Sequence, residues 1–283
     1  MKNKVLKRIV LFPIIAYALL LILLPLVYIL FLSFCQNDSY GGMIYHFTLS
    51  NYLSIFDITY IGILLKSSLI GLVTTFLCIC ISYPFALVLR ERSKNVQNLM
   101  TKLIMIPFLT NSLIRTYGWI VLLRKNGVIN SALIGTGLIH EPLGLMYNNL
   151  GIIIGMTYTL LPFMMLPVCS ATFKIDNNLI EAAKDLGAKP LSIFKNIIIP
   201  ETLPGVFNGS LMVFMPAIGY FFISDILGGG KAMIIGNLIK NQFLTARNWP
   251  FGAAISMFLL IITFLLIYIY RKLGGKLDDL GGM

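Results

Sequence analysis

Six long apolar runs constrain this chain more strongly than any other feature of its sequence. They cover residues 9–34, 61–89, 103–123, 150–173, 203–224 and 251–270. A helix needs about 20 apolar residues to cross the ~30 Å hydrocarbon core of a bilayer. None of the runs alternates strictly between polar and apolar residues, as the strands of a membrane barrel do. The sequence therefore predicts an all-α integral membrane protein with six transmembrane helices.

The rest of the chain leaves little room for a separate soluble domain. Hydrophobic residues make up 58% of the sequence and charged residues only 12%, a balance typical of membrane proteins. The longest polar stretches hold roughly 25 to 30 residues, fewer than a domain needs. The basic start MKNKVLKR resembles a secretory signal, but the apolar run after it is too long and no small-residue cleavage site follows. We expect residues 1–283 to form a single transmembrane domain.

Lysine and arginine residues predict the orientation of the helices, because short cytoplasmic loops are enriched in them. If the N-terminus is inside, the outer loops hold the smaller set of cations, namely Arg124, Lys125, Lys231, Lys240 and Arg247. The cytoplasmic segments hold the larger set, which comprises Lys2, Lys4, Lys7, Arg8, Arg90, Arg92, Lys94, Lys102, Lys174, Lys184, Lys189, Lys195, Arg271, Lys272 and Lys276. Both termini are therefore expected on the cytoplasmic side.

Charge and reactive residues argue against several other kinds of protein. The net charge of +11 is spread over the loops, which fits membrane topology and anionic lipid better than a nucleic-acid surface. The four cysteines form no C-x-x-C pair and indicate neither a metal site nor a disulfide framework. The sequence has no HExxH or GxSxG motif, and LGGGKAM lacks the first glycine and the hydroxyl residue of a phosphate-binding loop. We expect no catalytic residue, metal or cofactor in this chain.

Residues 174–200 form a polar segment between the fourth and fifth apolar runs. A first helix is expected with Asn178 as its cap. Its apolar face would consist of Leu179, Ala182, Ala183 and Leu186, which are spaced at i, i+3, i+4 and i+7. The segment is therefore expected to begin with an amphipathic helix.

A glycine and a proline predict a turn and a second helix after this one. Gly187 is expected to end the first helix in a left-handed conformation, and Pro190 to lie in the first turn of the second. The second helix would carry Ile193, Phe194, Ile197 and Ile198 on one side. Two interpretations of the segment remain open from the residues alone. It could be a linker that lies on the lipid surface, or a helix that docks into the groove of a partner protein.

The same segment resembles the EAA loop of ABC importer permeases. The residues that carry the resemblance are Glu181, Ala182, Ala183, Gly187, Ile197 and Pro200, with Ile199 at a position where leucine is usual. In that family the loop is a coupling helix that docks into a separate ATP-binding subunit. The resemblance implies the fold of a type I ABC importer permease, with ATP and magnesium bound by the partner subunit.

The resemblance extends along nearly the whole chain and is strongest to the permease subunits of spermidine/putrescine importers. It is carried by SYPFALVL from Ser82, IPFLTNSLIRTYGW from Ile106, LLPFMMLP from Leu160, SDILGGGKAMIIGNLIKNQF from Ser224 and NWPFGAA from Asn248. It implies a polyamine substrate and a location in the bacterial cytoplasmic (inner) membrane. It also implies three partners: a second permease subunit, an ATP-binding subunit dimer and an extracytoplasmic substrate-binding protein.

Asp225 is the candidate acid of a substrate pathway. It is expected at the outer end of the fifth apolar run, after Tyr220, Phe221 and Phe222, and a carboxylate beside ring faces suits an ammonium group. A solvated acid that caps a loop is the alternative, and the residues leave both open. Arg115, deep in the third run, is interpreted as structural or gating, because a cation is a poor ligand for a cationic substrate.

Prolines and glycines within the runs predict bent and closely packed helices. Interruptions of the fourth and fifth runs are expected at Pro162, Pro167, Pro204 and Pro216. Close packing is expected at glycines four residues apart, which are Gly151, Gly155, Gly205 and Gly209.

Three other functions compete with a polyamine permease. A permease for another small solute would share much of the same sequence. A secondary transporter driven by ion gradients is opposed by the EAA loop and by the scarcity of acids within the apolar runs. A membrane-embedded enzyme is the weakest alternative, because no catalytic arrangement of residues is present.

Overall fold

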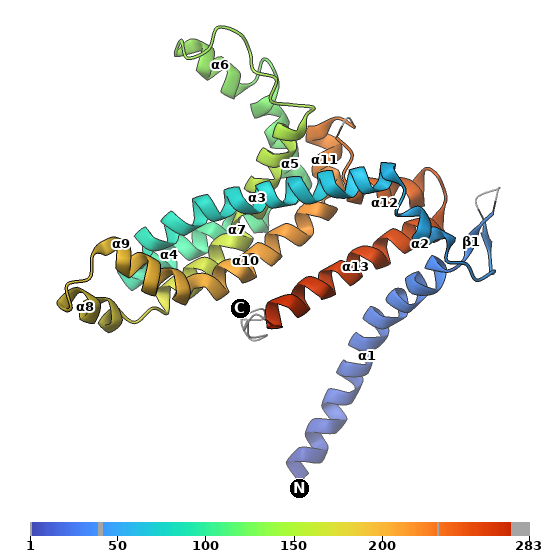
Figure 1. Cartoon of the computed structure of the whole chain (residues 1–283), viewed down its shortest axis with the longest axis horizontal. Coiled ribbons are helices and arrows are strands. Elements are labelled where there is room, and N and C mark those ends of the chain that lie inside the picture. The colour runs from blue at the N-terminus through green and yellow to red at the C-terminus, as the bar shows by residue number, and fades with distance from the viewer. Residues whose placement is uncertain (1, 39–41, 231, 273–283) are drawn as a thin grey trace. The chain divides into compact units, whose positions relative to one another are not determined.

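The computed structural model describes residues 2–38, 42–230 and 232–272, so Lys231 and the segment 273–283 lie outside the described residues. Regular structure is almost entirely helical (Figure 1), which confirms the predicted all-α class. The helices are α1 Lys2–Ser33, α2 Ser50–Ser54, α3 Ile58–Arg90, α4 Lys94–Met105, α5 Ser112–Leu123, α6 Val128–Gly135, α7 Asn149–Phe173, α8 Asn177–Asp185, α9 Pro190–Ile193, α10 Ile199–Gly219, α11 Phe221–Gly228, α12 Ile235–Leu244 and α13 Trp249–Lys272. A 3-10 helix η1 Ile106–Leu109, a π-helix η2 Phe194–Ile198 and a two-residue antiparallel pair, β1 Gln36–Asn37 with β2 Met43–Ile44, complete the elements.

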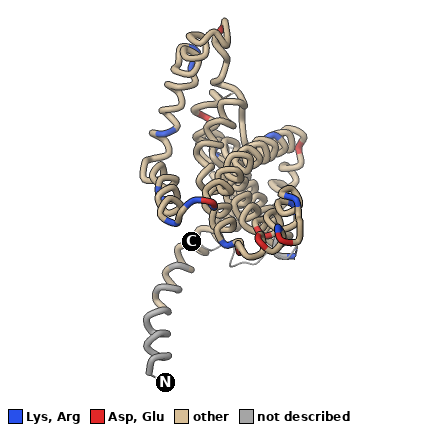
Figure 2. The backbone as a smooth tube through the Cα atoms, turned by 90° about the vertical axis from the view of Figure 1, so that its left-hand side faces the viewer, with Lys and Arg blue, Asp and Glu red and all other residues tan. Residues whose placement is uncertain are grey.

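Among the described residues, four helices are long and apolar enough to cross a membrane. They are Ile58–Arg90, Asn149–Phe173, Pro190–Gly219 and Trp249–Ile269, which correspond to the second, fourth, fifth and sixth apolar runs. The stretch Leu19–Ser33 of α1 is apolar but shorter. Acidic and basic residues gather mostly at the ends of helices and in connecting segments (Figure 2). The total of six spans stays a prediction.

The third apolar run, residues 103–123, is broken near its beginning, which was not expected from the sequence. Pro107 lies in the 3-10 helix η1, and Thr110 is extended with φ −98° and ψ 146°. Helix α5 then starts anew, and the Asn111 side chain caps it by accepting a hydrogen bond from the Leu113 N–H at 2.8 Å. Proline has no backbone N–H to donate, so breaking the helix here sacrifices fewer backbone hydrogen bonds than a break at another residue would.

The contacts divide the chain into two units, of which the first comprises residues 1–61 and 238–266. Within it, the end of α1 is held by the segment around α2. The Ser33 and Tyr52 hydroxyls lie 2.7 Å apart, and the Asn51 amide donates to the carbonyls of Ser33 and Cys35 at 3.0 and 2.8 Å. Tyr60 and Phe251 bring α3 and α13 together, with ring centroids 4.8 Å apart.

The second unit, residues 62–237 with the stretch after 266, has α7 at its centre. One face of α7 is fully buried and carries Ile152, Met156, Leu160, Met164 and Val168. Helices α10 and α11 pack on α7 through small residues, as the glycine spacing predicts. A Cβ placed on Gly209 would lie only 2.6 Å from the Met164 sulfur, and one placed on Gly155 would clash with Leu227.

The prolines have less effect than predicted. Helix α7 runs through Pro162 and Pro167, so the expected interruption of the fourth run is not seen. Each proline removes one N–H donor, and neighbouring helices that pack on α7 allow it to tolerate that loss. Helix α10 likewise contains Pro204 and Pro216, but it ends at Gly219, and Tyr220, with φ −72° and ψ 68°, separates it from α11. Asp225 therefore lies within a separate short helix and not at the end of the fifth span.

Candidate functional site

The polar segment 174–200 begins with helix α8, whose N-terminus differs from the prediction by two residues. Asp176 is the cap, because its carboxylate accepts a hydrogen bond from the Asn178 N–H at 2.9 Å. The assignment of Asn178 as the cap was therefore wrong. The buried side chain of Ile175 fixes the chain just before the helix, which leaves Asp176 in the extended conformation that a cap requires.

The other end of α8 confirms the predicted turn. Gly187 has φ +76°, its N–H donates to the Lys184 carbonyl at 2.8 Å, and the Ala188 N–H donates to the Ala183 carbonyl at 2.9 Å. This pair of hydrogen bonds is the Schellman motif, which needs a left-handed residue. Pro190 then takes the first position of α9, also as predicted.

The apolar stripe of α8 is not packed against this chain. Helix α8, all of whose residues are described, buries none of them. Leu186 is 88% exposed and Leu191, just after the turn, is 77% exposed. Glu181 and Ala182 are exposed as well, and Ala183 is half-buried. A surface of this kind, with a long apolar side chain beside alanines, is available to a partner.

An arginine side chain connects this segment to the end of α3, and a glutamine side chain connects the same end of α3 to α4. Arg90 donates through Nη2 to the Asn177 side-chain oxygen at 2.5 Å and to the Ile175 carbonyl at 3.3 Å. Gln97 in α4 donates to the backbone carbonyls of Arg90 and Arg92, both at 3.0 Å. The start of α8 is therefore attached to the end of α3, which is in turn held by α4.

The second half of the segment leads into α10 without a break. Residues Pro190–Gly219 form one long apolar helix, in which η2 adds a π-helical turn. Of the predicted motif residues here, Ile197 is half-buried in η2 and Pro200 is exposed at the start of α10. π-Helical turns occur frequently at functional sites.

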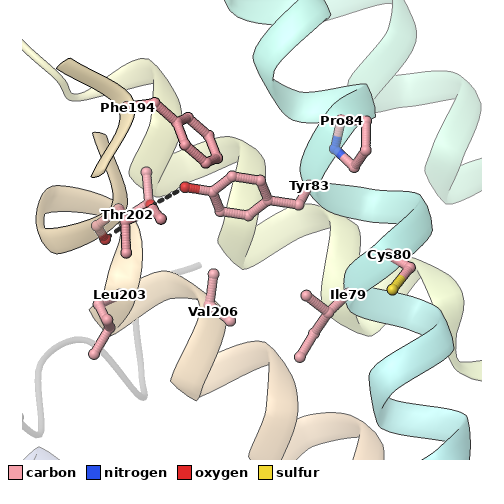
Figure 3. A pocket seen from close by; sticks show the side chains of 9 residues that line it. Ile79, Cys80, Tyr83, Pro84, Phe194, Thr202, Leu203 and Val206 are labelled. Carbon is pink, nitrogen blue, oxygen red and sulfur yellow. Dashed lines mark hydrogen bonds between the residues drawn. The ribbon is translucent and has the colours of Figure 1, made fainter. Parts of the chain in front are cut away.

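A tyrosine on α3 contacts this helix at the start of the π-turn and again in the first turns of α10. The Tyr83 hydroxyl lies 2.8 Å from the Thr202 hydroxyl, and its ring meets Phe194 edge-on with centroids 6.0 Å apart. Figure 3 shows Tyr83 pointing from α3 toward Thr202. Sequence reasoning missed this contact, because it joins residues 119 positions apart.

An apolar cavity of about 480 Å³ opens beside this tyrosine. Helix α3 and the start of α10 supply its walls, as seen in Figure 3. The lining residues are Ile79, Cys80, Tyr83, Pro84, Phe194, Ile199, Thr202, Leu203 and Val206. The two helices are therefore not in close contact on this side of Tyr83.

Asp225 and the three aromatic residues of the candidate substrate pathway gather around the start of α11. Tyr220 and Phe222 have ring centroids 5.2 Å apart, and Phe221 meets Phe222 edge-on at 6.2 Å. Asp225 is half-buried one turn further along the helix. The structure thus brings the four predicted residues into one region of the chain.

The Asp225 carboxylate also holds a turn together. Asn237 donates through Nδ2 to Asp225 Oδ1 at 2.5 Å and to the Phe221 carbonyl at 3.1 Å, and its own oxygen accepts from the Ile234 N–H at 3.1 Å. The Ser224 hydroxyl donates to the Ala232 carbonyl at 2.6 Å. Asn237 was not singled out from the sequence, although an asparagine within an apolar stretch indicates a residue with a specific hydrogen-bonding role. Both earlier interpretations of Asp225, ligand and structural acid, remain compatible with this geometry.

Among the described residues, no group of three or more histidine, cysteine, aspartate or glutamate side chains could hold a metal ion.

Comparison with known proteins places the chain among membrane transport components. Residues 3–278 match a family described as binding-protein-dependent transport system inner membrane component. The spermidine/putrescine transport system permease protein PotB of Escherichia coli K12 is 42% identical over 94% of this chain and 96% of that protein. PotB of Haemophilus influenzae is 38% identical over 98% and 96%, respectively. A chain of the crystal structure of a bacterial alginate ABC transporter with its periplasmic protein aligns over 96% of both chains, with a TM-score of 0.75 and 16% identity, which shows a shared fold.

Proposed function

Since the chain belongs to the family of binding-protein-dependent transport system inner membrane components, we propose that it is the permease subunit through which an ATP-driven importer moves spermidine or putrescine. The observation that carries this proposal is the sequence identity of 38–42% between this chain and permeases named for these polyamines, which extends over nearly the whole length of both. The exposed EAA-type helix α8 supports the ATP-driven part independently, because a secondary transporter has no use for such a surface.

The proposed complex contains three kinds of partner. A second, PotC-like permease would complete the translocation pathway, a PotA-like dimer would bind ATP and magnesium, and a PotD-like extracytoplasmic protein would deliver the substrate. This chain itself would hold no cofactor and perform no covalent chemistry. It would lie in the bacterial inner membrane with both termini in the cytoplasm, in contact with lipid and not with nucleic acid.

Coupling is proposed to run through the segment 174–200. The residues assigned to it are Glu181, Ala182, Ala183, Gly187, Ile197 and Pro200. A groove on the ATP-binding subunit would receive the exposed face of α8. When that subunit closes, α8 would move with it, and two connections would transmit the movement. One is the Arg90 hydrogen bond to Asn177, and the other is the continuous helix from Pro190 to Gly219.

The substrate is proposed to pass the region of Asp225. A polyamine carries several ammonium groups, whose dehydration in a narrow passage costs several kcal/mol unless carboxylates, carbonyls or ring faces replace water. Asp225, Tyr220, Phe221 and Phe222 supply a carboxylate and three rings. A negative charge at this point would also repel anions.

Uptake measurements in cells lacking their own polyamine importers test this function. The chain is expressed with its partner subunits, and uptake of labelled spermidine and putrescine is compared with uptake of sulfate. We expect polyamine uptake that disappears when the partner ATPase is inactivated. Specific uptake of an anion would overturn the substrate assignment. Uptake that survives ATPase inactivation but is abolished by a proton uncoupler would instead establish an ion-driven transporter.

A further inference from the structure

Arg115 is a permanently charged side chain in the interior of the second unit. It lies in α5, is half-buried, and packs against two aromatic rings. Its guanidinium carbon lies 5.9 Å from the centroid of Phe108 in η1 and 5.9 Å from that of Tyr158 in α7. Ring faces stabilise a cation, but they do not replace the hydrogen bonds that its N–H groups lose when they leave water.

The hydrogen-bonding capacity of this guanidinium is unused within the described residues. Nε and Nη1 are buried and have no hydrogen-bond partner among them. Arg115 also forms no ion pair with a carboxylate of the described chain. A buried arginine that keeps its charge usually pairs with a carboxylate, because an unpaired one costs several kcal/mol. The part of the side chain that remains accessible, which includes Nη2, is where such a group can reach it.

The depth of Arg115 excludes a lipid headgroup as its partner. Tyr158, which it contacts, is nine residues from the Asn149 end of α7 and fifteen residues from the Phe173 end. At 1.5 Å per residue these distances are about 14 and 22 Å. Lipid phosphates lie at the edges of a ~30 Å hydrocarbon core. The partner must therefore be a protein group or a solute within the membrane, and a cationic solute would be repelled.

An unpacked face of α5 lies next to this arginine. Ile114 is 70% exposed, Tyr117 is 58% exposed, and Val121 is also exposed. Gly118 lies between them on the same face, and a Cβ placed there would meet no described atom within 4 Å. These positions follow the i, i+3, i+4, i+7 spacing of one helix face, and a glycine on such a face allows another helix to approach closely.

We propose that this face of α5 packs against the second permease subunit, which supplies a carboxylate to Arg115 at mid-membrane. The inference rests on the proposed function, because it requires that subunit. We assign this face to a second membrane protein on grounds of charge. An unpaired cation at this depth needs an anion, and a neighbouring membrane protein can hold a carboxylate there. The pair would also fix which permease chain joins this one, because a partner with an apolar residue at that place would leave Arg115 uncompensated.

Site-specific crosslinking followed by charge exchange tests the inference. Tyr117 is replaced by the photoreactive p-benzoylphenylalanine in the co-expressed importer, and the crosslinked peptide is identified by mass spectrometry. We expect a membrane segment of the second permease that contains aspartate or glutamate. Arg115→Glu should then reduce the yield of the complex tenfold or more, and changing the identified acid to arginine should restore it.

Two matched variants separate charge from shape. Arg115→Lys keeps the charge and should retain most of the complex, whereas Arg115→Met should lose it. Lys66→Met removes another cation within an apolar run and should have little effect. A complex that forms normally with Arg115→Met would overturn this inference and leave the proposed function intact. A crosslink that reaches only this chain or lipid would do the same. A wild-type chain that purifies without any second permease would overturn the proposed function and this inference with it.

Discussion

At the scale of single residues, Asp225 combines a structural contact with a proposed binding role. Its Oδ1 accepts a hydrogen bond from Asn237, which also holds the Phe221 carbonyl. An asparagine at position 225 would offer a similar oxygen to Asn237, so it would keep this hydrogen bond and lose the charge. The nearly isosteric Asp225→Asn variant is therefore more informative than Asp225→Ala, which would remove the hydrogen bond as well as the charge.

We expect Asp225→Asn to lower polyamine uptake tenfold or more, in line with the loss of a charge-assisted interaction of about 1.5–3 kcal/mol. Phe222→Leu should cause a smaller loss, because a ring face contributes less than a carboxylate. Assembly of the importer should not change. Asn237→Ala serves as the control for the turn, and it should lower thermal stability. Full uptake by a properly assembled Asp225→Asn complex would remove this residue from the pathway.

Gly187 is the second residue whose role follows from its own geometry. With φ +76° it occupies a conformation that costs other residues about 1–2 kcal/mol. Space is not the constraint, because a Cβ there would meet no described atom within 4 Å. Asparagine tolerates this conformation far better than leucine does.

Gly187→Leu should therefore disturb the turn between α8 and α9, whereas Gly187→Asn should be close to wild type. We expect the leucine variant to lower substrate-stimulated ATP hydrolysis several-fold and leave polyamine selectivity unchanged. Glu181→Lys should have a similar effect, because it reverses the charge on the exposed face of α8. If both variants assemble fully and hydrolyse ATP normally, α8 is only a linker.

At the scale of elements, the contact between α3 and the long helix Pro190–Gly219 is the place where the proposed movement of α8 would reach the membrane helices. Tyr83 contacts Phe194, the first residue of η2, and Thr202 in α10, and the apolar cavity lies beside it. Thr202 also donates to the Ile198 carbonyl at 2.7 Å, so its hydroxyl would remain satisfied without Tyr83.

Tyr83→Phe should cost about 1 kcal/mol for the lost hydrogen bond, with little effect on packing. We expect the importer to assemble but to transport fewer polyamine molecules per ATP hydrolysed, because α3 would follow α10 less closely. The ratio of uptake to hydrolysis in proteoliposomes measures this. Tyr268→Phe, at an exposed position of α13, is the control. An unchanged ratio would assign the Tyr83 hydroxyl a purely local role.

Some features of these elements could be predicted from the sequence, and others could not. The turn at Gly187 and Pro190 was predicted correctly because its causes are local, a left-handed residue and a fixed φ. The cap was misplaced because Asp176 and Asn178 are both suitable cap residues, and the chain is held at the buried Ile175 just before Asp176. The break near Pro107 and the separation of α11 from α10 were not predicted, although a proline lies at the first of them. The hydrogen bonds Tyr83–Thr202 and Asp225–Asn237 join distant parts of the sequence, and no local pattern indicates them.

At the scale of the whole molecule, orientation in the membrane decides whether the coupling proposal holds. Helix α8 can meet an ATP-binding subunit only if the segment 174–200 is cytoplasmic. The same orientation places the N-terminus of α7 outside. Single cysteines on either side and an impermeant thiol reagent can distinguish the two orientations.

The native cysteines allow this experiment with one background change. Cys80 is exposed and is replaced by alanine first, whereas Cys35, Cys78 and Cys169 are buried. Burial also raises the pKa of the Cys35 thiol, so less of the reactive thiolate forms near neutral pH. Suitable exposed positions for new cysteines are Ser93, Asn178 and Asn149. Asn178 is preferable to Asn177, because Asn177 accepts a hydrogen bond from Arg90.

In intact cells we expect the reagent to label the cysteine at position 149 and to leave those at 93 and 178 unlabelled until the membrane is permeabilised. The positive-inside distribution of lysine and arginine is the reason, since it places both polar segments on the cytoplasmic side. Labelling of position 178 from outside would reverse the orientation. Helix α8 could then not reach a cytoplasmic ATPase, and the acid at position 225 would face the wrong side of the membrane to receive a polyamine from an extracytoplasmic binding protein.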